Sequence, residues 1–465
     1  MFDIKSLFTS SKYRPLDKNL VKEYNRHRPA GPQKHLCYVP FKSIYFGHNG
    51  RAIACCYNRT HILGTYPQQS IKEIWFGEEA ERLRDYMRND DLSLGCHGCN
   101  QHIVSGNFDG IKSIEADEFP MNKNKYPSTM SFELSNVCNL ECEMCSGDFS
   151  SLIRAKREKL PPVAMAYDSE FVKQLEEFVP YLEEVKFYGG EPFLIDIYHE
   201  IWDLIIKIKP SIRITLQTNG TVLNSRVKEL LRNSNFHIGV SLDSLKKDVY
   251  EGIRKNADFE TVMKNVEYFH AYSKERDTFF GLSVCAMQQN WSELPDFVNY
   301  CNQLNVPVYF HTVSYPLHCS IRTMKPDELV KVSEYLWSFN FPEDTATQKK
   351  NKRHYFDFVK QVDAWAKISD KIAGREDVST MAKLKVNVAE HIRNDKALND
   401  TMKAARIEKI VGKITELDHR LDKEFVANAM AKIDINDPSL LDNVVFYVDK
   451  LPLAALVAMS KTTFK

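Results

Sequence analysis

Three cysteines stand close together in the segment Cys138-Asn-Leu-Glu-Cys142-Glu-Met-Cys145, and their spacing constrains this chain more than any other feature. They directly follow Thr129–Val137, which has the composition of a β-strand. In a chain that shows no secretory segment, such spacing indicates a metal or redox site rather than disulfides. An ordinary 4Fe–4S cluster takes four cysteine ligands, so three would leave one iron open to another ligand.

Four further cysteines with ligand-like spacing precede this triad. Ser43–Phe46 and Arg51–Cys55 flank the turn residues Asn49-Gly50, which predicts a β-hairpin, and Ser70–Arg88 has helical spacing. If this strand continues, Cys56 would point to the face opposite to that of Cys55. We interpret Cys56 as a packed thiol, with a spare ligand as the alternative. The predicted four-thiolate site consists of Cys37, Cys55, Cys96 and Cys99.

From residue 129 onward, predicted strands and helices alternate. Six such units argue for a parallel α/β architecture, and the pattern alone also allows a doubly wound sheet. The predicted strands are Thr129–Val137, Glu184–Tyr188, Arg213–Thr218, His237–Leu242, Phe279–Met287 and Val308–Val313. The predicted helices include Ser169–Tyr181, Asp196–Lys209, Asn224–Asn233, Phe259–Lys274 and Trp291–Gln303.

The triad after a first barrel strand resembles the C-x-x-x-C-x-hydrophobic-C motif of the radical S-adenosylmethionine (SAM) superfamily. The resemblance implies a 4Fe–4S cluster on Cys138, Cys142 and Cys145 whose open iron binds SAM, and cleavage of SAM to a 5′-deoxyadenosyl radical. It places Met144 against the adenine. It also selects a partial (β/α)6 TIM-like barrel, with cofactor and substrate at the C-terminal ends of the strands.

Later segments resemble the motifs with which this family holds SAM, and each follows a predicted strand. Gly189-Gly190-Glu191-Pro192 resembles the motif for the SAM amine, with Glu191 as the ionic partner. Each of these segments also has an alternative interpretation without a ligand. The Gly189–Pro192 segment could be a plain glycine turn, Asn219 a turn cap, Asp243 a helix cap and Arg254 a surface charge. The resemblance assigns the other SAM contacts to Asn219, Ser241, Asp243 and Arg254.

Cys37, Gly50 and Cys55 resemble the opening pattern of SPASM and twitch domains, the auxiliary-cluster modules of radical SAM enzymes. The cysteines suffice for one auxiliary 4Fe–4S cluster, which favours the twitch form. Here the module precedes the barrel, whereas it normally follows it. A structural zinc ion on the same four thiolates is the alternative.

Three cysteines remain, and a buried free cysteine usually packs as a small hydrophobe. That is the default for Cys285, Cys301 and Cys319. The sharper hypothesis is that Cys285 or Cys319 faces the barrel and donates a hydrogen atom to a substrate radical.

After about residue 325 the pattern is wholly helical, and we expect a helical C-terminal region whose apolar stripes pack as a core. One stripe runs over Tyr355–Ala366 and another over Ile407–Phe425. We therefore expect three parts: an N-terminal auxiliary module over 1–125, a radical SAM barrel over 126–322 and helices over 323–465.

The balance of 62 basic and 62 acidic residues gives no footprint for general nucleic-acid binding, although it is compatible with a local basic groove. The longest apolar runs are too short to span a membrane, and the N-terminus resembles no signal peptide. We therefore expect a cytoplasmic protein.

The function that the resemblance implies is hydrogen abstraction from a substrate after reductive cleavage of SAM, with a flavodoxin- or ferredoxin-type electron donor. Auxiliary-cluster modules commonly accompany the maturation of ribosomally made peptides, which makes a peptide the first substrate expected. The second is a small molecule such as a sugar, altered by dehydrogenation or epimerisation. A non-catalytic iron–sulfur or zinc scaffold is the alternative from another class.

Overall fold

The computed structural model describes residues 13–108, 111–314, 316–373, 381–394 and 400–421, and the single residues Leu441, Val444, Val445 and Val448. The side chains of 368–373 and 401–402 are outside this description. The chain forms two compact units. The first combines Met1–Glu141, Cys145–Ser241 and Lys255–Gly281, and the second combines Cys142–Met144, Leu242–Arg254 and Leu282–Lys465. No helix in the described ranges is long and apolar enough to cross a membrane.

The N-terminal part of the first unit contains the expected hairpin. Strands β1 (Ser43–Gly47) and β2 (Arg51–Ile53) pair antiparallel, with Tyr45 opposite Ile53. Gly50 makes the turn at a φ of 74°. The short strand β3 (Gly64–Thr65) continues the sheet beside β2. The surrounding helices are α1 (Lys18–His27), α2 (Val39–Lys42), α3 (Ile71–Trp75), α4 (Glu78–Arg88), α5 (His97–Val104) and α6 (Ser113–Asp117).

The helical spacing over Ser70–Arg88 suggests one continuous helix. This prediction is wrong, because the segment forms two separate helices, α3 and α4. Gly77 lies between them and is the N-cap of α4 in an extended conformation. A Cβ atom at Gly77 would lie 2.4 Å from the carbonyl oxygen of Glu73. The close backbone approach at this break therefore requires glycine.

The hairpin extends the sheet of the barrel strands. β1 pairs in parallel with β4 (Thr129–Glu133), with Ser43 beside Thr129 and Gly47 beside Glu133. Within the first unit the strand order is β3-β2-β1-β4-β5-β6-β7, where the later strands are β5 (Glu184–Phe187), β6 (Arg213–Thr218) and β7 (Asn235–Ser241). The hairpin strands of the auxiliary module and the barrel strands of this unit thus form one continuous sheet.

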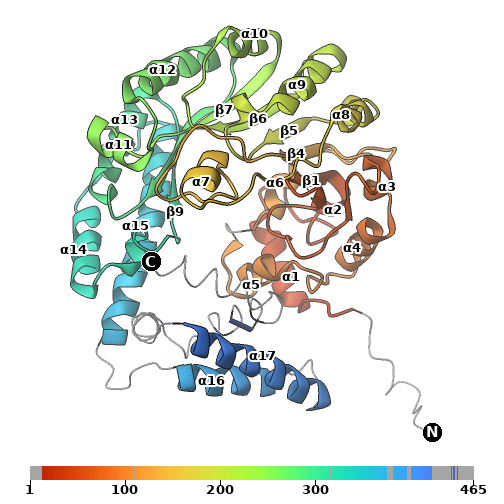
Figure 1. Ribbon diagram of the computed structural model, residues 1–465, viewed down its shortest axis with the longest axis vertical. Coiled ribbons are helices and arrows are strands. Elements are labelled where there is room, and N and C mark those ends of the chain that lie inside the picture. The colour runs from red at the N-terminus through yellow and green to blue at the C-terminus, as the bar shows by residue number, and fades with distance from the viewer. Residues whose placement is uncertain are drawn as a thin grey trace. The chain divides into compact units, whose positions relative to one another are not determined.

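The strands β4 to β7 are parallel, and helices cover one face of them (Figure 1). These helices are α8 (Ser169–Leu175), α9 (Asp196–Ile208), α10 (Ser225–Asn233) and α12 (Phe259–Arg276). Alternate strand residues such as Phe132, Phe187 and Leu216 face them and are buried. The residues between, such as Ser131, Lys186 and Gln217, face the other side. They belong to a polar inner surface.

In the second unit, β8 (Phe280–Ala286) pairs in parallel with β9 (Val308–Thr312), and Cys285 lies beside His311. Helices η5 (Trp291–Glu293) and α13 (Leu294–Leu304) connect the two strands. The two units together supply the six strand–helix repeats that the sequence predicts. The fold class is therefore mixed α/β, in agreement with the expected partial barrel.

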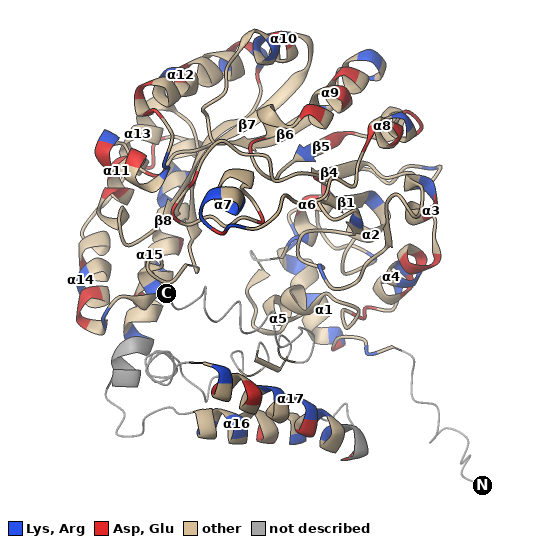
Figure 2. Ribbon diagram, in the orientation of Figure 1, with Lys and Arg blue, Asp and Glu red and all other residues tan. Residues whose placement is uncertain are grey.

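The C-terminal helices of the second unit are α14 (Pro326–Trp337), α15 (Ala346–Ala373), α16 (Met381–Arg393) and α17 (Asp400–Arg420). Tyr355 and Val362 of the first predicted stripe are buried, and Ile410 and Ile414 of the second pack against α16, so the core-packing interpretation is confirmed. Phe425 lies outside the described residues. Both α16 and α17 carry charged residues of both signs (Figure 2). The expected division into three parts stays a prediction.

Candidate functional site

The end of β4 leads into the loop that contains the cysteine triad. In the first unit, the backbone N–H of Cys138 donates to Ser151 Oγ at 3.2 Å. The Asn219 side chain, just beyond β6, points its Nδ2 at Cys138 Sγ at 3.9 Å and donates to Asn139 Oδ1 at 3.0 Å. Two segments that the sequence assigned to SAM binding therefore meet at Cys138.

The glycines after β5 allow a close approach to this loop. Gly189 and Gly190 have φ angles of 81° and 44°. Cβ atoms there would lie 2.6 Å from the carbonyl oxygen of Ser135 and 2.0 Å from that of Val137. The backbone N–H of Glu191 donates to the same Val137 oxygen at 2.8 Å. Glycine is therefore required at positions 189 and 190 because the backbone just before Cys138 lies so close. The predicted contact of these two glycines with SAM stays a prediction.

Glu191 is fully buried, which the sequence did not reveal. Its carboxylate accepts hydrogen bonds from Thr218 Oγ1 at 2.7 Å and from the backbone N–H of Asn219 at 2.7 Å. The N–H of Phe193 donates to it at 3.3 Å. Glu191 therefore fixes the segment that carries Asn219. Its assignment as the partner of the SAM amine stays a prediction.

In the second unit, Arg254 and Asp243 form a buried ion pair. Arg254 Nε lies 2.8 Å from Asp243 Oδ2. Arg254 Nη1 lies 3.9 Å from Cys142 Sγ. Burial opposes the charge of Arg254, but Asp243 and then Cys142 more than offset this effect and raise its pKa. The sequence expected separate SAM contacts from Asp243 and Arg254, and the structure joins the two.

The other predicted residues of the second unit lie together. Met144 and Cys285 pack against a core cluster of Ile253, Met287, Val313 and Cys319. Cys319 is completely buried there, which suits the packed-thiol interpretation, and Cys301 is likewise buried on α13. The hydrogen-donor role of Cys285 or Cys319 stays a prediction.

Two predicted residues remain in the first unit. Ser241, at the end of β7, accepts a hydrogen bond from Gln217 Nε2 at 2.9 Å. The thiol of Cys145 lies 3.6 Å from the carbonyl oxygen of Ser146, and Arg157 donates to the carbonyl oxygen of Cys145. Ser241 is thus the last residue of a barrel strand, and Cys145 lies in the segment that follows β4.

The four auxiliary thiols gather around one pocket of the first unit. The pocket is lined by Cys37, Cys55, Cys96 and Cys99, with apolar neighbours such as Leu36 and Ile103. Cys37 comes before α2 and Cys55 follows β2. Cys96 is the N-cap residue of α5, and Cys99 lies in its first turn. As the side chains stand, no three His, Cys, Asp or Glu residues of the described ranges are grouped so that they could hold one metal ion.

Burial is the largest cause of the raised pKa values of these thiols. It raises the pKa of Cys55 to about 12. Burial, and then Cys96, Cys55 and Cys99, raise the pKa of Cys37 well above its usual value. Without a metal these thiols would be protonated, and a bound metal would deprotonate them. Four half-buried thiols that line one pocket supply the donor set of an iron–sulfur cluster, and equally that of zinc.

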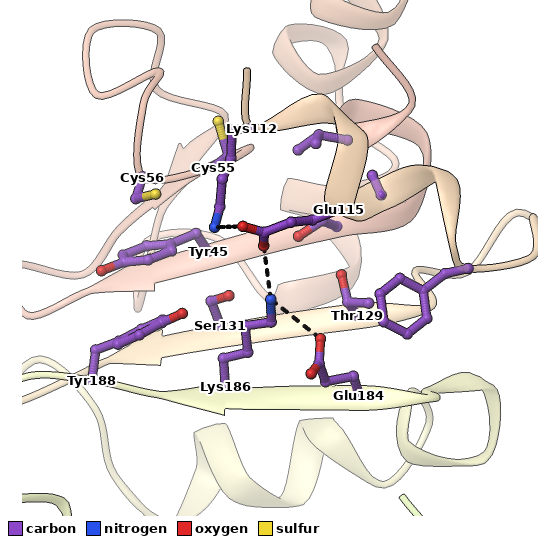
Figure 3. A pocket seen from close by; sticks show the side chains of 14 residues that line it. Tyr45, Cys55, Cys56, Lys112, Glu115, Thr129, Ser131, Glu184, Lys186 and Tyr188 are labelled. Carbon is purple, nitrogen blue, oxygen red and sulfur yellow. Dashed lines mark hydrogen bonds and ion pairs between the residues drawn. The ribbon is translucent and has the colours of Figure 1, made fainter. Parts of the chain in front are cut away.

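A second, charged pocket adjoins the thiol pocket (Figure 3). Val39, Cys55 and Lys112 line both. On the inner surface of the sheet, Lys186 Nζ lies 3.0 Å from Glu115 and 3.3 Å from Glu184, and Lys112 also pairs with Glu115. Cys56 lines this pocket, away from the four-thiol pocket.

Sequence reasoning missed Glu133, the last residue of β4. It is buried, accepts a hydrogen bond from Tyr45 and lies 3.4 Å from Arg59. Its Cγ would touch a Cβ on Gly189. A carboxylate at the C-terminal end of a barrel strand is a usable signal. Its partners come from the hairpin module, and only the tertiary fold reveals them.

Comparisons with family models match two parts of the chain. Residues 132–301 match the model of the radical SAM superfamily, and residues 37–100 match an iron–sulfur cluster-binding domain, SPASM. GTP 3′,8-cyclase of Clostridium botulinum (strain Okra / Type B1) is 25% identical over 177 residues, 38% of this chain and 53% of that protein. GTP 3′,8-cyclase of Clostridium perfringens (strain SM101 / Type A) is 30% identical over 150 residues, 31% and 44% of the two chains. The chain thus spans about half the length of these relatives.

Two solved structures are also similar. Native anSMEcpe with bound AdoMet has 21% identity and a TM-score of 0.36, over 45% of this chain and 60% of that one. Streptococcus suis SuiB bound to its precursor peptide SuiA has 15% identity and a TM-score of 0.34, over 57% and 52%. From the two family models, the chain contains a radical SAM superfamily domain that follows an iron–sulfur cluster-binding domain.

Proposed function

We propose that Cys138, Cys142 and Cys145 hold a 4Fe–4S cluster with SAM, and that the enzyme abstracts a hydrogen atom from a substrate. The observation that carries this proposal is the meeting of the Gly189-Gly190-Glu191 and Asn219 segments at Cys138. When bound, the cluster and SAM would supply the 5′-deoxyadenosyl radical. The electron would come from a flavodoxin- or ferredoxin-type donor in the cytoplasm.

The contribution of the chain's own residues is to position these ligands. Glu191 holds the backbone of Asn219, and Asn219 in turn holds Asn139 beside the first thiol. Gly190 lets the backbone after β5 lie directly on Val137. Because each contact fixes a loop at the end of a different strand, the cofactor would meet a preorganised surface.

We further propose that Cys37, Cys55, Cys96 and Cys99 hold one auxiliary 4Fe–4S cluster, with zinc as the alternative. The lining of one pocket by these four half-buried thiols supports this proposal. We place this module at residues 1–125, the SAM barrel at 126–322 and a helical region of unassigned role at 323–465.

We propose the charged pocket as the substrate site. Cys55, one of the auxiliary thiols, lines both this pocket and the thiol pocket, and Tyr188, which lines the charged pocket, directly precedes the glycines after β5. Its lysines and glutamates already pair with one another, so an additional buried charge would lack a partner. Uncharged groups that both donate and accept hydrogen bonds fit best, as in the main chain of a peptide. A sugar-like small molecule is the second candidate.

Iron, sulfide and zinc counts on anaerobically reconstituted protein test the metal assignments. We expect about eight irons per chain, about four in a Cys142→Ala variant and about four in a Cys55→Ala/Cys96→Ala variant. Cys301→Ala is the matched control, because Cys301 is a buried thiol on α13, and it should keep all the iron. About four irons with one zinc in the wild type would make the auxiliary site structural. An unchanged iron count in Cys142→Ala would contradict the proposal for the triad.

A further inference from the structure

Arg254 is placed by the end of a helix and by one carboxylate. It is the C-cap residue of α11 (Lys247–Ile253), where its backbone leaves the helical conformation. Its side chain is only 7% exposed, and that of Asp243 is 0% exposed. A buried guanidinium requires a charge partner, and the 2.8 Å contact with Asp243 supplies one.

Asp243 is itself held in place. Its Oδ1 accepts the backbone N–H of Cys285 at 2.7 Å. Its carbonyl oxygen accepts Asn290 Nδ2 at 2.7 Å, and Asn290 also donates to the carbonyl oxygen of Cys285 at 2.9 Å. The carboxylate therefore fixes the Nε edge of Arg254, and the opposite edge of the guanidinium points Nη1 at Cys142 Sγ.

We propose that Arg254 is a positioning residue for Cys142. Arg254 donates a charge-assisted hydrogen bond to the sulfur of this ligand and thereby sets the reduction potential of the SAM cluster. The inference rests on the proposed role of Cys142 as a cluster ligand. It differs from the role that the family resemblance implies, in which Arg254 contacts SAM. In this role the guanidinium of Arg254 interacts with the Asp243 carboxylate and the Cys142 thiolate, and not with SAM.

The sign of the effect follows from electrostatics. Reduction adds one negative charge to the cluster and its thiolates, so a nearby cation stabilises the reduced state and raises the potential. Hydrogen bonds to cluster sulfurs and the charges around them are among the factors that set such potentials. Asp243 opposes the cation, and in the wild type it partly offsets the effect of Arg254.

The two partners should therefore shift the potential in opposite directions. In Arg254→Gln the reduced state loses a cation, and we expect its ratio to the oxidised state to fall at least tenfold at a given applied potential. For a one-electron couple this is a midpoint lower by about 59 mV. In Asp243→Asn, which keeps an oxygen for the N–H of Cys285, the midpoint should rise. Arg254→Lys should stay close to the wild type.

The measurement is an EPR-monitored redox titration of reconstituted full-length protein without SAM. The signal of the SAM cluster is identified as the EPR signal that disappears in Cys142→Ala. If no signal disappears in this variant, the wild type has no cluster on Cys142. That result would overturn the proposed function, and this inference with it.

With the cluster present, a midpoint of Arg254→Gln equal to that of the wild type would overturn the inference alone. So would a shift of both variants in the same direction, which is the result expected of a purely structural ion pair. If Arg254→Gln fails to retain the cluster, Asp243→Asn decides: a raised midpoint supports the inference, and an unchanged or lowered one overturns it.

Discussion

A Cβ atom on Gly190 would lie 2.0 Å from the carbonyl oxygen of Val137, so the backbones after β5 and before Cys138 touch directly. Gly190→Ala would also place a side chain at a left-handed φ of 44°. We expect the loop of Cys138 to shift and the iron at the triad to be lost, with a destabilisation of about 1–3 kcal/mol. Iron analysis and urea unfolding measure the two effects.

Gly252→Ala is the matched control, because a Cβ atom there, on α11, meets nothing within 4 Å. Alanine favours a helix over glycine by roughly 1 kcal/mol, so this variant should be neutral or slightly more stable. Equal loss of iron in both variants would contradict the explanation by close approach.

The carboxylate of Glu191 accepts three hydrogen bonds in a fully buried position. Glu191→Gln would keep one acceptor oxygen and turn an NH2 group toward a donor such as the N–H of Asn219. A buried donor without an acceptor costs about 1–3 kcal/mol, and we expect a loss of that size in the free energy of unfolding. Stability equal to the wild type would show that the carboxylate does not hold this loop.

Two Arg–Asp pairs with the same 2.5 Å contact, one in the N-terminal module and one between α9 and α10, test the importance of burial. Arg28 and Asp117 are almost wholly buried, whereas Arg226 and Asp203 are partly exposed. Breaking a buried pair leaves an unpaired charge, so Asp117→Ala should cost about 3–5 kcal/mol. Asp203→Ala should cost less than about 1 kcal/mol. Similar losses in denaturant unfolding would contradict the assignment of Arg28 to the folded core of the module.

Burial, and then Arg213, lower the pKa of His237 to about 4. In agreement, His237 Nδ1 accepts the backbone N–H of Phe279 at 3.1 Å, which requires a neutral nitrogen. The unfolded chain would bind a proton at about pH 6.5, so His237 removes stability as the pH falls from about 6.5 to about 4. The loss by pH 4 is up to about 3 kcal/mol.

His237→Gln keeps an acceptor for Phe279 and has no such proton to bind. Denaturant unfolding at several pH values should therefore show a smaller loss of stability in the variant between about pH 6.5 and about pH 4. The two proteins should differ little in this slope above pH 7. Parallel curves over the whole range would contradict the lowered pKa.

Local patterns in the sequence predicted the hairpin, the order of strands and helices, and the cysteine motifs. They failed where distant segments meet. The parallel pairing of β1 with β4 joins Ser43 to Thr129, and no local signal encodes it. The ion pair of Arg28 with Asp117 likewise joins residues that lie far apart in the sequence.

The candidate site shows the same limit. The residue types at the strand ends were predicted, but not their burial or their contacts with one another. Glu191 binds the segment of Asn219, and Arg254 binds Asp243. Both pairs are separated by at least ten residues and close only when the strands assemble. Sequence motifs identify such residues, whereas the fold is needed to say which of them face a ligand and which support a neighbour.

The central claim is that the triad supports cleavage of SAM. The most direct measurement is the yield of 5′-deoxyadenosine, by mass spectrometry, from reconstituted protein reduced with dithionite and mixed with SAM. We predict the nucleoside from the wild type and from Cys301→Ala, and none from Cys142→Ala. Absence of the nucleoside from wild-type protein with a full iron load would contradict the account and favour a non-catalytic cluster scaffold.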